Sequence, residues 1–344
     1  MKKLTAALLC GAMLLTGCSE KKPEDTQAHT RDLFAMDTFM TMKAYGDNAE
    51  QGLSAAAEEI TTLEKLLAVT DENSDISRIN NSSGKPVEVS EDTAAILSAG
   101  ISYGDLTGGA LDITVYPVLR EWGFTTGEYR IPESGELKEL LERVDYKQVR
   151  VEDGRVTLPG DFMVDAGSLA KGYTSDKVIG ILRDSGVESA VVSLGGNVQT
   201  LGKKPDGSQW KVAVKDPFAP EKEMCIVSID EKAVITSGSY ERNFTGEDGN
   251  NYWHIIDPSD GRPADNGLVS VTVIGDSGLM CDALSTAIFV CGTEGAEELW
   301  RQQQDFDLIL VTDDHRLLIT EGIEDSFTNI GSMETEVLRL DKTS

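Results

Sequence analysis

The segment Val164-Asp165-Ala166-Gly167-Ser168-Leu169-Ala170-Lys171-Gly172-Tyr173 is the stretch from which the fold of this chain can be built outward. Its apolar beginning predicts a strand that ends in an acid, and its small residues predict a turn that opens a helix over 168–184. Helix N-termini present free N–H groups and partial positive charge, which suit a phosphate. Lys171 adds a full charge, although the glycine spacing of a Walker loop is absent. The segment is therefore either a phosphate site or a capped helix with a solvated lysine.

Helices and strands flank this segment on both sides without strict alternation. Strands are predicted at 34–44, 148–151, 156–158, 162–164 and 190–194, and they dominate 211–274. Helices are predicted at 49–67, after a cap at Ser90, and at 134–143, 282–290 and 294–303. Strands 307–311 and 317–320 form a predicted hairpin about Asp313-Asp314. The mixture indicates an α+β fold with mixed or antiparallel sheets and flanking helices. No linker divides 32–344, so we expect one catalytic domain there.

The first twenty residues resemble a targeting segment. Lys2 and Lys3 precede an apolar run that is shorter than the roughly 20 residues a membrane-spanning helix needs. The run ends in Leu15-Thr16-Gly17-Cys18, which looks like a lipobox whose cysteine is acylated; the alternative is an ordinary secretory peptide. We expect a lipoprotein signal peptide over 1–17 and a lipid-anchored flexible tether over 18–31, which contains His29. The expected location is the cell envelope, on the extracytoplasmic face of a bacterial membrane.

Charge and cysteine content exclude several classes of partner and site. The formal net charge is −28, and removal of Lys2 and Lys3 with the signal peptide leaves 29 − 59 = −30. Nucleic acid is therefore not an expected partner, because binding it needs a basic surface. After Cys10 and Cys18, three cysteines remain, namely Cys225, Cys281 and Cys291. Their odd number and spacing indicate neither a disulfide framework nor a zinc site, so we expect buried, small apolar residues.

Histidine is scarce, which makes His254 the histidine best placed for chemistry. It lies in Tyr252-Trp253-His254-Ile255-Ile256-Asp257-Pro258, before a turn set by Asp257-Pro258 and Gly261. A histidine at such a strand end can serve as a general base near neutral pH. The alternative is a structural strand histidine. His315, by contrast, lies in a predicted exposed turn.

Two further stretches carry candidate binding residues. In Cys281-Asp282-Ala283-Leu284-Ser285-Thr286-Ala287, Asp282 and Thr286 are four residues apart and share one face of a helix. Their oxygens can occupy two sites of a hard cation such as Mg²⁺, or Asp282 is only an N-cap. In Gly108-Gly109-Ala110-Leu111-Asp112, small residues allow a flat ligand to approach the backbone, or they form only a tight turn.

Taken together and in this order, the motifs resemble the FAD:protein FMN transferase family, often called ApbE. The resemblance spans about 36–320. The matching pieces are Met36-Asp37-Thr38-Phe39, Asn73-Ser74-Asp75-Ile76-Ser77-Arg78-Ile79-Asn80, Thr107-Gly108-Gly109-Ala110-Leu111-Asp112, Asp165-Ala166-Gly167-Ser168-Leu169-Ala170-Lys171-Gly172, Leu194-Gly195-Gly196-Asn197, Thr236-Ser237-Gly238, His254-Ile255-Ile256-Asp257-Pro258 and Asp282-Ala283-Leu284-Ser285-Thr286-Ala287. Each piece alone is weak, but eight pieces in family order are specific.

The resemblance implies an α+β fold of the T-fold type and a flavin transfer reaction. Such enzymes bind FAD with Mg²⁺ and move FMN onto a Ser or Thr hydroxyl of a target flavoprotein through a phosphoester bond, releasing AMP. By position, the metal ligands would be the side chains of Asp282 and Thr286 and the carbonyl of Ser168. His254 would lie beside the pyrophosphate as the candidate base. The other implied FAD contacts are Met36, Ala110, Leu111, Asp112, Asp165, Lys171 and Ile256.

One position departs from the family pattern. Many relatives have a tyrosine near the flavin at the position of Thr70, four residues before Ser74. A smaller residue there changes how FAD is held, or the balance of transfer against hydrolysis. Two alternatives therefore stay open, namely an FAD pyrophosphatase that gives FMN and AMP, and a non-catalytic flavin-binding lipoprotein.

Overall fold

The computed structural model describes residues 27–340. Its α-helices are α1 (Ala49–Leu67), α2 (Asp75–Asn80), α3 (Glu91–Leu106), α4 (Tyr116–Glu121), α5 (Ser134–Leu141), α6 (Ala170–Asp184) and α7 (Gly278–Gln303). Its strands are β1 (Ala28–Ala35), β2 (Thr38–Tyr45), β3 (Val87–Glu88), β4 (Arg150–Glu152), β5 (Arg155–Thr157), β6 (Ser189–Leu194), β7 (Asn197–Leu201), β8 (Trp210–Asp216), β9 (Ala219–Ile229), β10 (Ala233–Gly238), β11 (Asn243–Thr245), β12 (Asn251–Trp253), β13 (Leu268–Gly275), β14 (Phe306–Thr312), β15 (Leu317–Thr320), β16 (Phe327–Asn329) and β17 (Thr335–Leu338).

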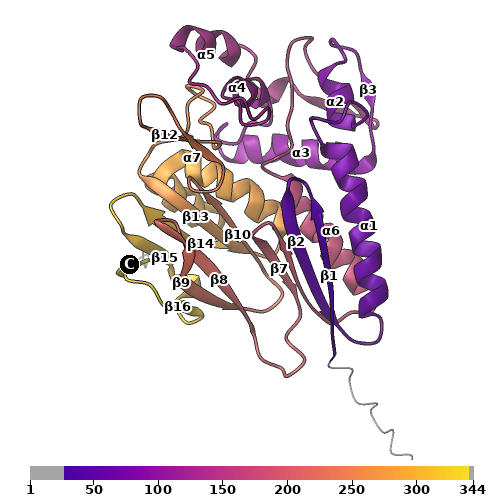
Figure 1. Ribbon diagram of the computed structural model, residues 1–344, viewed down its shortest axis with the longest axis vertical. Helices are drawn as coiled ribbons and strands as arrows, with labels where there is room; N and C mark the ends of the chain where they lie inside the picture. The colour runs from indigo at the N-terminus through magenta and orange to yellow at the C-terminus, as the bar shows by residue number, and fades with distance from the viewer. Residues whose placement is uncertain (1–26, 341–344) are drawn as a thin grey trace, which may run out of the picture.

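A nine-stranded sheet forms the centre of the molecule, in the order β1-β2-β6-β7-β10-β13-β14-β15-β17 (Figure 1). Neighbouring strands are antiparallel, apart from the parallel pair β15 and β17. The large sheet therefore contains strands from both the N-terminal and the C-terminal half of the chain. Smaller sheets are formed by β16-β9-β8, β3-β5-β4 and β11-β12.

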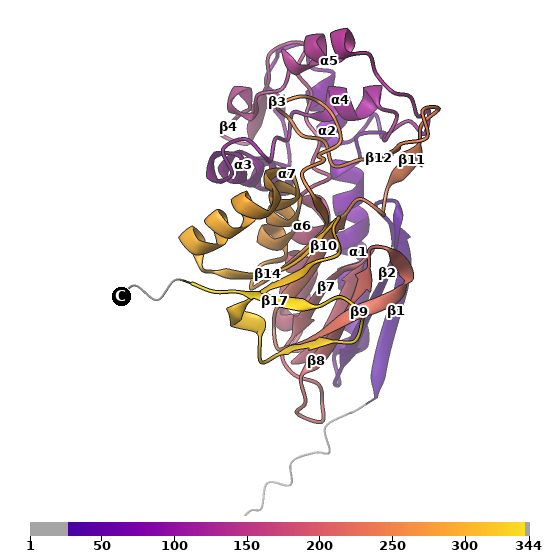
Figure 2. The same cartoon turned by 90° about the vertical axis from the view of Figure 1, so that its left-hand side faces the viewer.

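Each face of the large sheet is covered by a different layer. On β10, Ile235 packs in the cluster that contains the apolar side chains of α7, whereas the adjacent Val234 packs with β8 and β9. This alternation is the period-2 pattern of a strand buried on both faces. Helices α1, α6 and α7 thus lie on one face and the β16-β9-β8 sheet on the other (Figures 1 and 2).

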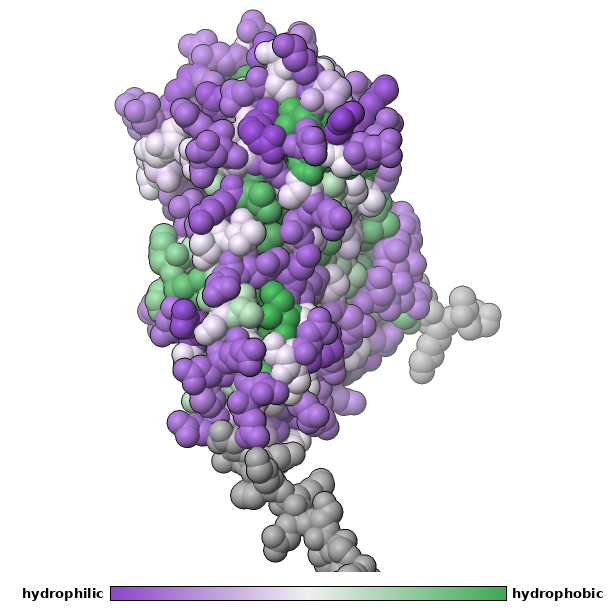
Figure 3. All heavy atoms as spheres, turned by 90° about the vertical axis from the view of Figure 1, so that its right-hand side faces the viewer, coloured by the Kyte–Doolittle hydropathy of each residue, from purple (hydrophilic) through white to green (hydrophobic). Residues whose placement is uncertain are grey.

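A helical region lies beyond one end of the large sheet, at the top of Figure 1. It contains α2 to α5 and the short strands β3, β11 and β12. Two apolar clusters join this region to the rest of the chain, one around Leu111 and Leu169 and one around Trp122 and Ile256. The face shown in Figure 3 is mostly hydrophilic, and its hydrophobic side chains form separate small patches.

The α+β prediction is confirmed, and several predicted elements have the expected bounds. The helix predicted at 49–67 is α1. Ser90 caps α3 by accepting a hydrogen bond from the Thr93 amide. The predicted hairpin is formed by β14 and β15, with His315 exposed in its turn.

Other predicted elements are wrong in part. Residues 28–31, assigned to the tether, form the first half of β1, because pairing with β2 satisfies their backbone without apolar side chains. The single strand predicted at 34–44 is a hairpin of β1 and β2. The helices predicted at 282–290 and 294–303 are one helix, α7, which is kinked at Gly292 and starts at Gly278. The strand predicted at 162–164 is irregular.

Some predictions concern residues that the structure does not describe. The signal peptide, Cys18 and the tether up to residue 26 lie outside the described residues. Within 27–340, no helix combines the length and apolar character needed to cross a membrane. The three described cysteines are free; Cys225 and Cys281 are buried as expected, but Cys291 on α7 is exposed, so that prediction was wrong for Cys291.

Candidate functional site

A pocket of about 720 Å³ opens where the large sheet meets the helical region. Its volume lies in the range of about 300–1,000 Å³ that is typical of small-molecule sites. It is lined by every site residue predicted from the sequence except Cys18. These are Met36, Thr70, Ala110, Leu111, Asp112, Asp165, Ser168, Lys171, His254, Ile256, Asp282 and Thr286. The structure thus brings together residues that are up to 250 positions apart in the sequence, as the difference 286 − 36 shows.

The Asp165 segment approaches the pocket as an irregular strand. The side chain of Asn80 accepts a hydrogen bond from the Val164 amide at 2.7 Å and donates to the Val164 carbonyl at 2.9 Å. The Asp165 amide donates to the Ile113 carbonyl at 2.9 Å. The Gly167 amide then donates to Oδ1 of Asp165 at 3.0 Å, which closes the turn. Helix α6 begins at Ala170, two residues later than predicted. Burial raises the pKa of Asp165, and the positive charge of Arg242 opposes that rise.

Asp112 has a structural role in the pocket wall. Its Oδ1 accepts hydrogen bonds from the Thr114 amide at 2.7 Å and hydroxyl at 2.5 Å, and its Oδ2 accepts one from the Tyr146 amide at 3.0 Å. Burial nevertheless raises the pKa of Asp112. Because both oxygens are engaged, the Asp112 carboxylate fixes the loop that presents Ala110 and Leu111 to the pocket.

The β1–β2 turn holds Met36 at the pocket in an uncommon backbone conformation. Met36 and Asp37 have φ values of 50° and 58°, in the left-handed region that costs L-residues energy. The carboxylate of Glu64 on α1 accepts a hydrogen bond from the Met36 amide at 2.7 Å. Such strained positions persist where surrounding contacts determine them, and they often mark functional sites.

His254 is held by the backbone of Arg242 at the end of β12. Its amide donates to the Arg242 carbonyl at 3.0 Å, and Nδ1 lies 3.3 Å from the same oxygen. A carbonyl oxygen only accepts, so this contact assigns the proton to Nδ1 and leaves Nε2 as the basic nitrogen. Burial lowers the pKa of His254 to about 4, and the positive charges of Arg242 and Lys171 act in the same direction. The imidazole is therefore neutral near pH 7.

Asp282 lies inside α7, which excludes the N-cap alternative. Ser277 caps this helix by accepting a hydrogen bond from the Met280 amide. Oδ2 of Asp282 accepts from the Gly172 amide at 2.7 Å, and Oδ1 accepts from Nδ2 of Asn197 at 3.0 Å. Burial raises the pKa of Asp282, while Lys171 opposes the rise.

The residues around Asp282 fit a small hard cation. Asp282 is 4% exposed, and it belongs to none of the ion pairs described in 27–340. Lys171 supplies positive charge nearby without forming one of these ion pairs, and a bound cation would compensate the buried carboxylate directly. The hydroxyl of Thr286 lies one helical turn away and also faces the pocket, with Ser237 Oγ at 3.5 Å. No cluster of three or more His, Cys, Asp or Glu ligands occurs in the described part of the chain, and a set of one carboxylate, one hydroxyl and one carbonyl does not require one.

Several pocket residues were not predicted from the sequence. Glu241 and Arg242 follow the Thr236-Ser237-Gly238 motif, and Lys215 reaches the pocket from β8. Burial raises the pKa of Glu241, and the positive charges of Lys171 and Lys215 oppose this rise. The charged pair lies only three and four residues beyond the end of β10, and this position was a usable signal for Glu241 and Arg242. Lys215 gave none, because it alternates along β8 like a solvent-facing residue.

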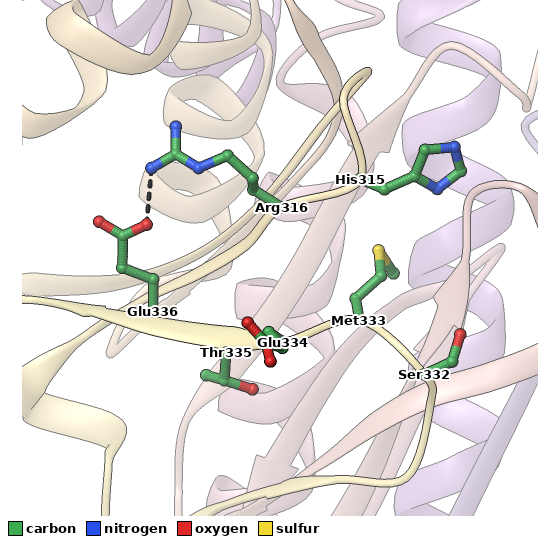
Figure 4. A pocket seen from close by; sticks show the side chains of 7 residues that line it. All are labelled: His315, Arg316, Ser332, Met333, Glu334, Thr335 and Glu336. Carbon is green, nitrogen blue, oxygen red and sulfur yellow. Dashed lines mark hydrogen bonds and ion pairs between the residues drawn. The ribbon is translucent and has the colours of Figure 1, made fainter.

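A second hollow lies apart from this site, between the β14–β15 turn and β17 (Figure 4). It is lined by His315, Arg316, Ser332, Met333, Glu334, Thr335 and Glu336. Arg316 and Glu336 form an exposed ion pair at 2.6 Å across it. The hollow contains none of the predicted site residues, so we place the functional site in the larger pocket.

Comparisons with known proteins agree with this site. A model of the ApbE family matches residues 36–310. An FAD:protein FMN transferase of Treponema pallidum is 30% identical over 340 residues, which covers 92% of each protein. The transferase of Escherichia coli K12 is 31% identical over 315 residues, covering 86% of this chain and 89% of that protein.

Solved structures show the same fold. The crystal structure of the ApbE protein from Thermotoga maritima gives a TM-score of 0.82 at 31% identity, covering 87% of this chain and 99% of that one. The apo flavinyl transferase ApbE of Pseudomonas stutzeri gives a TM-score of 0.78 at 26% identity, covering 89% and 98%. The match extends over most of each protein and includes the pocket motifs, so the chain belongs to the ApbE family.

Proposed function

We propose that this chain is an FAD:protein FMN transferase, which moves FMN from FAD onto a hydroxyl of an acceptor protein. The observation that carries this proposal is the convergence of the predicted site residues in one pocket of about 720 Å³. The relatives that match most of the chain are named for this transfer. Phosphoryl transfer depends mainly on positioning and charge neutralisation, and the pocket offers groups for both.

We further propose that the pocket takes Mg²⁺ between the Ser168 carbonyl, Asp282 and Thr286. These are hard oxygen donors, and few protein ligands suffice when phosphate oxygens and water complete the coordination. Bound there, Mg²⁺ would supply Lewis-acid stabilisation of the pyrophosphate and of the AMP leaving group. The burial of the Asp282 carboxylate supports this proposal, because a buried negative charge favours a bound cation.

The chain's own residues position the substrate and move the proton. Lys171 and the N-terminus of α6 present positive charge to the pyrophosphate. The hydroxyl oxygen of the acceptor Ser or Thr attacks the FMN phosphorus, and His254 Nε2 accepts the proton of that hydroxyl. The new P–O bond of the phosphoester forms while the bond to AMP breaks. The neutral imidazole that this role requires agrees with the lowered pKa of His254.

A second candidate function is FAD hydrolysis to FMN and AMP. Its support is Thr70, an exposed residue in the pocket wall, at the position where the family resemblance implies an aromatic side chain near the flavin. In that reaction water replaces the acceptor hydroxyl. A flavin-binding protein without catalysis, the third alternative, predicts that FAD stays intact.

We also propose that Cys18 carries lipid and anchors the enzyme to the extracytoplasmic face of a bacterial membrane. The support is the signal-like sequence up to Gly17-Cys18. An anchored enzyme would meet envelope acceptors at raised effective concentration. Metabolic labelling with a fatty acid, compared between the chain and Cys18→Ala, tests the anchor; label on both would contradict it.

The transfer proposal is tested by incubating the chain with FAD, Mg²⁺ and an acceptor domain that carries a Ser or Thr acceptor motif. We expect a covalent yellow adduct that survives denaturation. Free FMN and AMP without an adduct would favour the hydrolase, and intact FAD would favour the binding protein.

A further inference from the structure

The carboxylate of Asp176 joins two helices beside the pocket. Asp176 belongs to α6, yet its Oδ1 accepts a hydrogen bond from the Gly278 amide at 2.7 Å. Its Oδ2 accepts from the Leu279 amide at 3.0 Å and from the Ser277 hydroxyl at 2.8 Å. Three consecutive residues at the N-terminus of α7 are thus bound to one side chain of α6. The amide of Gln199 on β7 donates to Oδ1 at 2.8 Å and fixes the carboxylate from the sheet.

The two helices cross here without spare room. A Cβ atom added at Gly172 would lie 2.3 Å from the Gly278 carbonyl oxygen. A Cβ atom added at Gly278 would lie 2.2 Å from the Ser175 hydroxyl. These distances are far below van der Waals contact, so the crossing depends on the two glycines. Asp176 lies one helical turn beyond Gly172 on the same helix and holds α7 against this contact.

The proposed cation ligands are divided between the same two helices. Ser168 precedes the first turn of α6, whereas Asp282 and Thr286 lie on α7. Asp282 is four residues, or about 6 Å along the helix axis, from the capped start of α7. A shift of α7 along α6 therefore changes the distance between the Ser168 carbonyl and the Asp282 carboxylate.

We propose that Asp176 is a positioning residue for the cation site, which holds the α6 and α7 halves of the ligand set at binding distance. This inference rests on the proposed Mg²⁺ site and names a residue that touches neither the cation nor FAD. Ser277 already caps α7 by accepting a hydrogen bond from the Met280 amide at 3.2 Å, so α7 does not need Asp176 as a cap. Asp176 instead sets the position of the N-terminus of α7 relative to α6.

The test compares Asp176→Asn with Asp184→Asn in the full chain. Both residues lie on α6 and both substitutions remove one negative charge, but Asp184 is exposed at the end of the helix. Asn at 176 places an amide nitrogen against N–H donors of α7. The readout is the affinity for Mn²⁺, used as a paramagnetic substitute for Mg²⁺ and measured by electron paramagnetic resonance without FAD. Circular dichroism melting confirms that each variant is folded at the assay temperature.

We expect Asp176→Asn to weaken Mn²⁺ binding by about 10–100-fold, as for other residues that orient metal ligands. Asp184→Asn should bind like the unsubstituted chain. Saturating Mg²⁺ should also restore FMN transfer in Asp176→Asn, because the site is displaced rather than removed. Mn²⁺ affinity equal to that of the unsubstituted chain, in a folded Asp176→Asn protein, would overturn the inference.

A gentler variant decides the matter if Asp176→Asn does not fold. Ser277→Ala removes the hydroxyl bond to Oδ2 and the cap on the Met280 amide, and it leaves the two backbone bonds to Asp176 in place. Weakened Mn²⁺ binding in folded Ser277→Ala supports the inference, and unchanged binding overturns it. This outcome is separate from the transfer proposal. A chain that binds Mn²⁺ but forms no flavin adduct would contradict the transferase proposal and would not contradict the role of Asp176.

Discussion

The backbone amide of Gly172 donates a 2.7 Å hydrogen bond to Oδ2 of Asp282, and this bond joins α6 to α7 beside the pocket. A glycine is required at 172 because a Cβ atom there would lie 2.5 Å from the Asp282 Cβ. The same two residues therefore connect the phosphate-binding segment with the proposed cation site. The close helix crossing is the structural basis of both.

Gly172→Ala should lower the free energy of unfolding by about 1–3 kcal/mol, because the added methyl group forces the helices apart. Gly180→Ala is the matched control on the same helix, since nothing lies within 4 Å of a Cβ atom there. This control should stabilise the protein by about 1 kcal/mol through helix propensity. Urea unfolding measures the free energy of unfolding of both variants. Equal changes in the two variants would contradict the close contact of α6 and α7 at Gly172.

Asp282→Ala should reduce FMN transfer and its Mg²⁺ dependence together. Loss of the only carboxylate in the proposed ligand set removes several kcal/mol of transition-state stabilisation, which corresponds to a rate loss on the order of 10²-fold or more. Asp276→Ala, an exposed acid just before α7, is the control. Transfer rates are measured across a Mg²⁺ titration. A variant that keeps the normal Mg²⁺ response would remove Asp282 from the ligand set.

His254→Gln should leave FAD binding intact and slow transfer by about 10²–10⁴-fold, the usual contribution of a general base. His315→Gln serves as the control, because His315 is exposed in the β14–β15 turn outside the pocket. FAD affinity is measured by flavin fluorescence and transfer by covalent adduct. Unchanged turnover in His254→Gln would assign His254 a structural role.

The pH dependence of kcat/KM should reflect the lowered pKa of His254. The neutral imidazole is the basic form, and a pKa of about 4 keeps it neutral well below pH 6.5. Activity that depends on His254 should thus be retained through pH 6 and lost as the pH falls toward 4. Circular dichroism over the same range separates this loss from acid unfolding. A loss of activity centred near pH 6.5 in a folded protein would contradict the burial of His254.

Thr70→Tyr should tighten FAD binding about 2–12-fold, because one aromatic contact contributes about 0.5–1.5 kcal/mol. If Thr70 also favours hydrolysis, the fraction of FAD that is transferred rather than hydrolysed should rise. Thr62→Tyr, exposed on α1, is the control. Fluorescence titration and product analysis check both effects. Equal FAD affinity in Thr70→Tyr and Thr62→Tyr would show that this wall does not contact the flavin.

Local patterns predicted much of the fold and of the site. The apolar spacing of Leu53, Ile60, Leu63 and Leu67 fixed the bounds of α1, because a helix buries one face at that period. The four-residue spacing of Asp282 and Thr286 correctly placed both on one pocket-facing turn of α7. The family motifs supplied the other predicted site residues, such as Met36, Asp165 and His254, and all of these line the same pocket.

Features that depend on tertiary contacts were not predictable in this way. Val164 looks like part of a strand, but its backbone pairs with the Asn80 side chain, a contact between residues 84 positions apart. Lys215 follows the alternation of an exposed strand, and only the placement of β8 brings it to the pocket. The left-handed conformation of Met36 depends on Glu64, which no pattern in the β1–β2 turn reveals.

The central claim is that FMN leaves FAD for a protein hydroxyl, and one measurement tests it most directly. The chain is incubated with FAD, Mg²⁺ and an acceptor domain, and AMP and acceptor-bound FMN are quantified in the same sample. We predict equal amounts of AMP and covalently bound FMN, both abolished when the acceptor Ser or Thr is replaced by Ala. AMP matched by free FMN, with no flavin on the acceptor, would contradict the claim.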